Sequence, residues 1–143
     1  MNDADVRRAI YDLTVRNGHT PSARETAAEL GAAEPDVVEA FKRLAGERII
    51  VLGAQDDILM AAPFSGVPTP FTVRAGGKSY YANCIWDALG VSPMLQTDST
   101  ISTACPDCAE PLELRVENGA LTGEGIVHFS VPARQWWTDI VYT

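Results

Sequence analysis

The sequence is poor in the side chains that bind metals and form disulfides, with three cysteines and two histidines among 143 residues. It also has no apolar run near the roughly 20 residues that a membrane-spanning helix needs. The N-terminal stretch MNDADVRRAI is charged and lacks the apolar core of a secretory signal. With no signal and an odd number of cysteines, we expect reduced thiols and a cytoplasmic protein.

Positive charge is scarce as well. The chain has 11 Lys and Arg against 19 Asp and Glu, a net charge of −8. A positive field drives binding to nucleic acid and to anionic membranes, so the composition argues against both as general partners. The hydrophobic content of 46% is ordinary for a folded chain, and 143 residues suffice for a core without disulfides. We therefore expect one domain, alone or with a small appendage.

The first sixty residues predict three short helices followed by a hairpin. Apolar residues at helical spacing indicate helices over 3–17, 20–31 and from residue 34 onward, while 48–52 and 58–61 are typical of strands. This order is the outline of a winged helix-turn-helix. DNA binding is disfavoured because residues 1–60 hold seven basic and eleven acidic residues, a net charge of −4. We expect a winged-helix-like three-helix cap over residues 1–61 that packs on the rest of the chain.

The second half of the sequence indicates strands around one short helix. Residues 62–70, APFSGVPTP, are rich in Pro, Gly and Ser and are typical of a connector. We expect a hairpin over 71–82, a helix over 83–90 that ends at Gly90, and strands over 99–103, 111–116 and 125–131. The expected fold class is α+β, in which the cap is followed by a small mixed sheet and the short helix that carries the candidate catalytic residues.

Two of those residues, Cys84 and Asp87, lie three positions apart in 83-NCIWDALG-90. On a helix this spacing places both on one face. If the helix begins at Asn83, its dipole favours a thiolate at Cys84, the reactive form of cysteine. Asp87 would then pass a proton or supply an oxygen ligand to whatever the sulfur binds. The structural alternative is that Cys84 packs inward and Asp87 is solvated.

The other two cysteines stand in 105-CPDC-108 with the gap of a zinc knuckle. A zinc site would need two more ligands, for which Cys84 and His19 or His128 are the candidates. Soft thiolates also suit mercury, copper(I) and cadmium. A thioredoxin-like redox pair is disfavoured because a strand signal, not a helix, follows Cys108. A plain tight turn is equally compatible with the spacing.

The segment 80-YYANCIWDALGVSPMLQTDSTISTACPDCAEPLELRV-116 resembles the core of the alkylmercury (organomercurial) lyases. That family has a Cys-x-x-Asp pair in an aromatic, Leu-rich helix, a further cysteine downstream, and then a Pro-x-x-Leu-x-Val strand. Cys84 and Asp87 match its catalytic cysteine and aspartate, and Cys105 matches an intermediate cysteine usually considered structural. Its winged-helix-like cap, which does not bind DNA, corresponds to residues 1–61, and its α/β core to residues 71–143.

The resemblance implies protonolysis of a carbon–mercury bond, with Cys84 as the attacking thiolate and Asp87 as proton relay or ligand. It implies a small organometal as substrate, Hg(II) as the product ion, no required cofactor, and neither nucleic acid nor membrane as partner. The family has a second catalytic cysteine after a segment resembling 136-WWTDIVYT-143, where this sequence ends. We expect weak or absent lyase turnover for these 143 residues, with metal capture by Cys84 and Asp87 retained. Cys108 would substitute only if its loop folds back onto Cys84.

Two alternatives remain open. The first is a family relative without lyase activity that binds a soft metal or zinc through Cys84, Cys105 and Cys108, with Cys105 and Cys108 as the candidate zinc ligands. The second is a transcription regulator that senses a metal through the cysteines and uses the cap on DNA. The acidic residues Glu34, Asp36 and Glu39 at the start of the third helix count against it.

Overall fold

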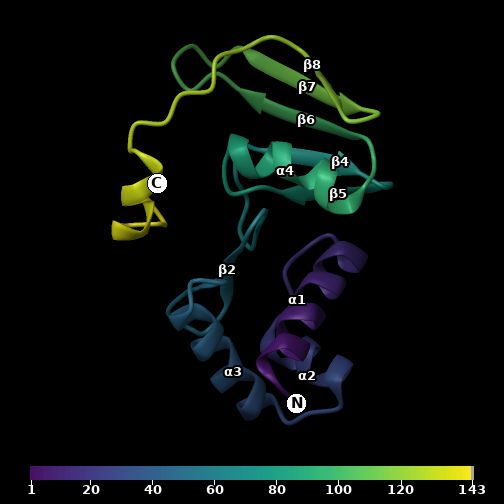
Figure 1. Cartoon of the computed structure of the whole chain (residues 1–143), viewed down its shortest axis with the longest axis vertical. Helices are drawn as coiled ribbons and strands as arrows, with labels where there is room; N and C mark the ends of the chain where they lie inside the picture. The colour runs from purple at the N-terminus through teal and green to yellow at the C-terminus, as the bar shows by residue number, and fades with distance from the viewer. Residues whose placement is uncertain (143) are drawn as a thin grey trace.

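The computed structural model describes residues 1–142, and Figure 1 shows a helical half and a sheet half stacked along its long axis. The helical half consists of α1 (Asp3–Asn17), α2 (Ala23–Leu30), α3 (Glu34–Gly46), β1 (Val51–Leu52), β2 (Ile58–Ala61) and β3 (Phe64–Ser65). The sheet half consists of β4 (Thr72–Ala75), β5 (Lys78–Tyr81), α4 (Ile85–Leu95), β6 (Ser99–Ala104), β7 (Pro111–Glu117) and β8 (Ala120–Thr122). A 3₁₀ segment, η1 (Ala133–Thr138), follows near the C-terminus.

Local sequence signals set the ends of the first two helices. Asn2 and Ser22 cap α1 and α2, and each exchanges hydrogen bonds with an acidic residue three positions on. Gly18 and Gly31 end these helices in the left-handed conformation that glycine adopts readily. The three predicted helices are confirmed, although the one expected over 20–31 begins at Ala23 because Ser22 is its cap.

The helical half has an apolar core of its own. Val6 and Ile10 of α1 meet Phe41 and Leu44 of α3, and Ile58 of β2 belongs to the same cluster. All five side chains are buried. Helices this short are marginal in isolation, so the burial of their apolar faces is what stabilises them.

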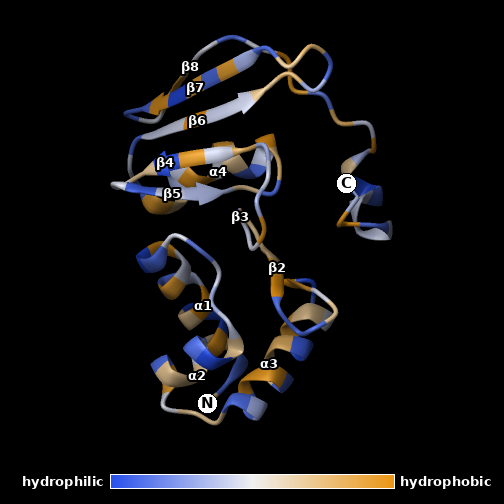
Figure 2. Cartoon of the chain, turned by 180° about the vertical axis from the view of Figure 1, so that it is seen from behind, coloured by the Kyte–Doolittle hydropathy of each residue, from blue (hydrophilic) through white to orange (hydrophobic). Residues whose placement is uncertain are grey.

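The larger sheet has the strand order β5-β4-β6-β7-β8, and every pairing among residues 1–142 is antiparallel. The prediction of a mixed sheet is therefore wrong. The chain crosses from β5 through α4 to β6, which pairs with β4 and not with β5, so no parallel ladder forms. The hairpin expected over 71–82 is confirmed as β4 and β5, with Gly76 and Gly77 at positive φ in its turn. Figure 2 shows that β4 and α4 carry much of the hydrophobic character of this half.

The strand expected over 125–131 is also wrong. Residues 124–131 lie outside any helix or strand, and Ile126 is 97% exposed. The last strand is β8 instead, which returns on β7 through a turn at Asn118 and Gly119. The apolar residues of this stretch make another kind of contact: Phe129 packs against Trp136, with ring centroids 5.2 Å apart.

Helix α4 begins later and runs further than its sequence suggests. Cys84 is its N-cap, and the helix continues through Gly90 and Pro93 to Leu95. Gly90 was expected to end it, but the buried side chains of Ala88 and Val91 hold the helix to the sheet beyond that point. Among residues 1–142, no helix combines the length and the apolar character needed to cross a membrane.

The two halves join at residues 62–65, within the stretch expected as a connector. The Tyr11 hydroxyl of α1 donates to the Ala62 carbonyl at 3.0 Å, and the Asn83 amide donates to the Pro63 carbonyl at 3.3 Å. Phe64 stacks at 5.1 Å on Tyr80, whose hydroxyl reaches back to α1. This joint places the start of α4 against the helical half.

Gly66 follows the joint at a point where the backbone approaches another strand closely. A Cβ at this position would overlap the carbonyl oxygen of Ile58 and lie 2.8 Å from Thr20 Oγ1. We expect Gly66→Ala to lower the free energy of unfolding by about 3 kcal/mol, because the backbone must shift to relieve the overlap. Urea denaturation measures the change. Gly46→Ala is the matched control, since nothing lies within 4 Å of its added Cβ; equal stability of the two variants would contradict the expectation.

Candidate functional site

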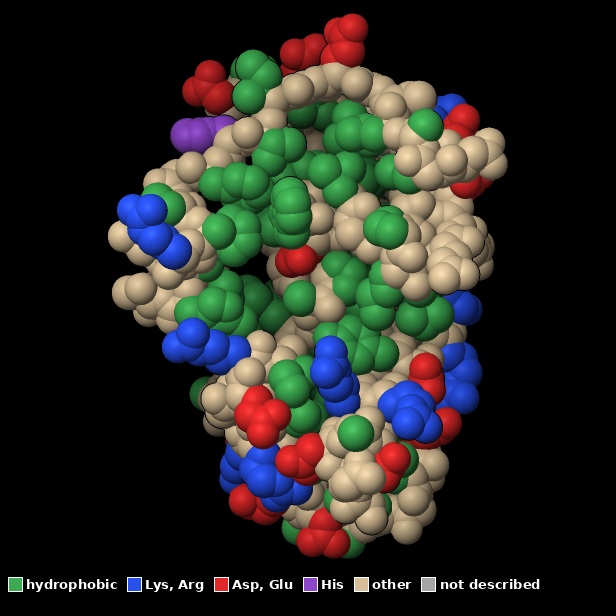
Figure 3. All heavy atoms as spheres, viewed as in Figure 1, with side chains coloured by type: hydrophobic (Ala, Val, Ile, Leu, Met, Phe, Trp, Pro, Cys, Tyr) green, Lys and Arg blue, Asp and Glu red, His purple; other side chains and the backbone are tan. Residues whose placement is uncertain are grey.

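A cavity of about 350 Å³ opens where the two halves meet. Three separate parts of the chain line it: the stretch from Arg48 to Ala62, the first turn of α4 from Asn83 to Asp87, and the C-terminal stretch from Phe129 to Tyr142. Figure 3 shows hydrophobic side chains gathered around a hollow at this level, with charged side chains crowding the helical half below. The cavity is therefore largely apolar, as small-molecule sites usually are.

Cys84 occupies the N-cap position of α4 with extended backbone, and its side chain is half-buried in the cavity wall. Burial raises the pKa of the Cys84 thiol, and the Asp87 carboxylate adds to the shift, while the backbone amides of Asp87 and Trp86 oppose it. The helix start therefore acts in the expected direction but is outweighed. The free thiol rests in its protonated form and must lose its proton when it binds an electrophile.

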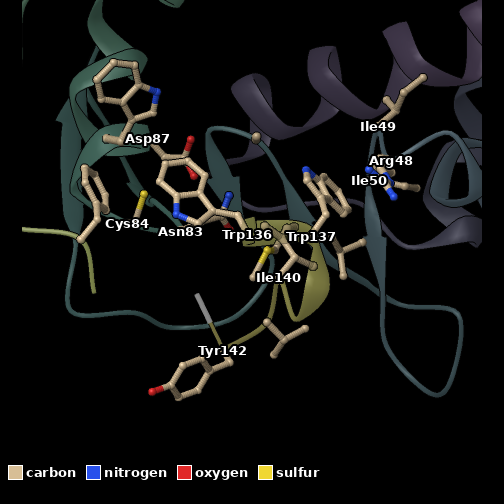
Figure 4. Close-up of a pocket in the computed structure, with 16 residues that line it drawn as sticks. Arg48, Ile49, Ile50, Asn83, Cys84, Asp87, Trp136, Trp137, Ile140 and Tyr142 are labelled. Atoms are coloured by element: carbon tan, nitrogen blue, oxygen red, sulfur yellow. The ribbon is translucent and has the colours of Figure 1, made fainter. Parts of the chain in front are cut away.

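Asp87 lies one turn further on and lines the same cavity. Burial raises the pKa of the Asp87 carboxyl, although hydrogen bonds from the Asn83 and Cys84 side chains partly offset the shift. A carboxyl group in this state keeps its proton to higher pH than an exposed one. The thiol and the carboxyl thus form one partly buried pair that lines the same cavity, and Figure 4 shows both at the same side of the pocket.

Asn83 is a site residue that sequence reasoning missed. Its side chain lines the cavity beside Cys84 and hydrogen-bonds Asp87, while its Oδ1 atom is buried without a hydrogen-bond partner among residues 1–142. A buried acceptor without a partner is costly and rare, and a ligand or a catalytic role is one explanation for it. The one available signal was its place directly before Cys84.

Aromatic side chains and one cation form the wall opposite α4. Phe129, Trp136 and Trp137 line the cavity, and the Trp136 indole nitrogen donates to the Val131 carbonyl at 2.8 Å. The guanidinium of Arg48 lies 5.5 Å from the centre of the Trp137 ring. This cation–π contact connects the helical half to the C-terminal stretch across the cavity. Nothing in the local pattern around Arg48 indicated that it would reach a site.

The CPDC turn lies apart from this cavity, at the end of the β6–β7 hairpin. The Cys105 amide donates to the Glu110 carbonyl at 2.9 Å, and the Ala109 amide donates back to Cys105 at 2.8 Å. The backbone amides of Cys108 and Asp107 and the Cys108 side chain lower the pKa of the Cys105 thiol. Nowhere in residues 1–142 do three or more Cys, His, Asp or Glu side chains gather to hold a metal, so Cys84 does not join this pair.

The two histidines considered as zinc ligands are also placed away from that turn. His128 lines a second cavity of about 220 Å³ that shares Cys84 and Asn83 with the first. His19 contacts the Thr20 carbonyl near the start of α2. A closed zinc site built from Cys105, Cys108 and either histidine is therefore absent from the described part of the chain.

A half-buried thiol beside a half-buried carboxyl, under an aromatic wall, defines a site that can bind a soft electrophile and give it a proton. Residues 64–143 match the family model described as MerB, alkylmercury lyase. This match spans more than half of the sequence, and the chain belongs to the alkylmercury lyase family.

The fold is similar to a solved structure whose title is "Crystal structure of the mercury-bound form of MerB2", with a TM-score of 0.64 and 27% sequence identity. The similarity covers 82% of this chain and 58% of the other, so this chain spans less than two thirds of that protein. No curated protein sequence matches the chain.

The shifted pKa of the thiol generates a direct prediction. We expect alkylation of Cys84 by iodoacetamide to rise with pH with a midpoint above the roughly 8.5 of an ordinary thiol. Asp87→Asn should move the midpoint to lower pH, because it removes the carboxylate that adds to the raised pKa. Mass spectrometry of the Cys84 peptide gives the rates. A wild-type midpoint below that of a free thiol would mean that the helix start, not burial, controls this cysteine.

Proposed function

We propose that this chain captures an organomercurial through Cys84 and protonates its carbon–mercury bond with Asp87. The observation that carries the proposal is the partly buried pair itself: a thiol and a carboxyl of raised pKa on one helical turn, facing one cavity. Membership of the alkylmercury lyase family and the likeness to a mercury-bound structure support it.

Capture exchanges the ligand on mercury. The Cys84 sulfur forms a bond to the soft Hg(II) centre, the previous ligand leaves, and the thiol proton departs with that ligand. The raised pKa of Cys84 delays loss of the proton in the free protein, so capture accelerates as pH rises toward that pKa. The amides at the start of α4 stabilise the charge that develops on sulfur during the exchange.

Cleavage then needs an acid at the carbon atom. The electron pair of the carbon–mercury bond takes the proton of Asp87, a carbon–hydrogen bond forms, and Hg(II) remains on the Cys84 sulfur. Asp87 is left as a carboxylate, which the Asn83 side chain stabilises through its hydrogen bond and which lies beside the mercury ion as a potential oxygen ligand. This step slows as pH rises through the raised pKa of Asp87, because the acid form is lost.

The apolar walls of the cavity give the organic group a place away from water. Trp86 of α4 and Trp136 and Ile140 of the C-terminal stretch contribute apolar side chains to these walls, and Asp87 of α4 lies beside Trp86 in the sequence. An environment of low polarity strengthens the interaction between mercury, sulfur and the carboxyl group. Within the described residues Cys84 is the one cysteine that lines this cavity. The family's second catalytic cysteine follows the segment that resembles 136–143, and Tyr142 of that segment lines the same cavity.

We expect the 143-residue polypeptide to bind one methylmercury at Cys84 and to release methane slowly. Adding a cysteine after Thr143 should accelerate release, because two thiolates polarise the bond better than one; an added serine is the matched control. In the cysteine-extended chain, Asp87→Asn should retain capture and slow release by about 100-fold or more. Gas chromatography of single-turnover reactions measures methane. Fast release that Asp87→Asn leaves unchanged would refute the proton-donor role.

A second candidate function is binding of a soft metal ion by Cys105 and Cys108. The observation in its favour is the turn that places both thiols together, with the pKa of Cys105 lowered by neighbouring amides. Two sulfurs alone suit a soft ion better than zinc, which takes four ligands.

Elemental analysis of protein purified without added metal separates these functions. We expect clearly less than one zinc per chain, and cadmium titration should produce a thiolate charge-transfer band that Cys105→Ser/Cys108→Ser removes and Cys84→Ser retains. A full equivalent of zinc that disappears with Cys105→Ser/Cys108→Ser would favour the family relative without lyase activity over the lyase.

A further inference from the structure

Among residues 1–142, Arg48 is the one basic residue and Asp87 the one acidic residue that line the cavity beside Cys84. Figure 4 shows them at opposite sides, with Trp136 and Trp137 between Arg48 and the Cys84–Asp87 pair. The cavity therefore has a reactive end and a cationic end, joined by an aromatic wall. A ligand that spans the cavity from end to end needs a flat apolar middle part and a negative group at the end away from mercury.

The guanidinium of Arg48 has an aromatic ring beside it but no ion pair with a carboxylate of residues 1–142. It lies 5.5 Å from the Trp137 ring centroid. A cation–π contact satisfies none of the guanidinium N–H groups with a carboxylate and leaves them able to donate to a ligand. A planar carboxylate is the acceptor that fits these N–H groups, through two parallel hydrogen bonds.

The backbone at Arg48 is also unusual for a residue with a side chain. Arg48 has φ of 60° at the end of α3, where its amide donates to the Ala45 carbonyl and the Ile49 amide donates to the Leu44 carbonyl. This is the position at which glycine most often ends a helix, because a Cβ is strained there. A large cationic side chain at this position is consistent with a use that offsets the strain.

The size of the cavity agrees with an aromatic ligand. A volume of about 350 Å³ far exceeds what a methyl group on mercury would fill, whereas an aryl ring can lie along the indoles of Trp136 and Trp137. With mercury on the Cys84 sulfur, a substituent on the far side of the ring points toward Arg48.

We propose that this site prefers arylmercurials that carry a carboxylate on the ring, and that Arg48 is the residue that selects them. This proposal rests on the proposed function, because it assumes capture at Cys84. For the hydroxide of such a compound, the Cys84 sulfur replaces the hydroxide on mercury, and the thiol proton leaves with it as water. The aryl–mercury bond stays intact in this step, so selection is made at capture.

The test compares 4-(hydroxymercuri)benzoate with phenylmercury hydroxide. Each binds in competition with 2-mercaptoethanol at low ionic strength, and the selectivity is the ratio of the two exchange constants. All three tryptophans of the chain line the cavity, so quenching of tryptophan fluorescence reports its occupancy in the wild-type chain without altering Cys105 or Cys108. Cys84→Ser identifies the signal that belongs to this thiol.

Arg48→Gly should lower the selectivity for the benzoate about three- to fivefold, the range of a partly exposed ion pair. The variant should fold at least as well as the wild type, because glycine accepts positive φ. Arg48→Lys should keep part of the preference, since it retains the charge but not the planar edge. Arg24→Gln, on α2 and outside the cavity, is the control for net charge and should change nothing.

Added salt should reduce the selectivity of the wild type and leave that of Arg48→Gly unchanged. Equal selectivity in wild type and Arg48→Gly, with both compounds captured at Cys84, would overturn the role of Arg48 and leave the proposed function standing. Quenching by neither compound, or quenching that persists in Cys84→Ser, would overturn the proposed function and this inference together.

Discussion

The first turn of α4 holds a thiol and a carboxyl where water reaches them only in part, and this partial burial governs the chemistry of the site. Both groups would be ordinary on an exposed helix. In the cavity wall the same residues have raised pKa values, since burial penalises their charged forms. A raised pKa keeps the proton on the Asp87 carboxyl to higher pH, which suits a group that must give a proton, and the Cys84 thiol must lose its own proton when it binds an electrophile. The cavity walls therefore shift the pKa values of both reactive groups, in addition to enclosing them.

The architecture serves this burial by bringing distant segments together. The sheet holds α4 through Ala88 and Val91, and the joint at residues 62–65 brings the helical half against its N-terminus. The β1–β2 hairpin contributes Val51 and Met60 to the cavity wall. In a DNA-binding winged helix, a hairpin at this place in the sequence would be the wing. The preceding helix, α3, begins with the acidic residues Glu34 and Asp36, and the hairpin that follows it lines the cavity.

Local sequence patterns predicted most of what depends on local structure. The three helices, the β4–β5 hairpin and the shared turn of Cys84 and Asp87 all follow from spacing and capping. The patterns failed where a distant contact decides: α4 continues past Gly90 because the sheet holds it, and residues 125–131 form no strand but contact Trp136 through Phe129 and Val131. The direction of the Cys84 pKa shift also depends on distant contacts. The sequence shows the helix start, which lowers this pKa, but not the distant residues that bury the thiol and raise it.

The cavity is built from pieces separated by most of the chain, and this has a consequence for biosynthesis. The helical core around Val6 and Phe41 can form early, whereas the stretch from Phe129 to Tyr142 is synthesised after the other parts of the cavity wall. Until then Cys84 and Asp87 stand on a helix without their aromatic wall, in contact with water. A nascent chain at that stage therefore carries a more ordinary cysteine, and the raised pKa of Cys84 arises only when the stretch from Phe129 to Tyr142 packs over it.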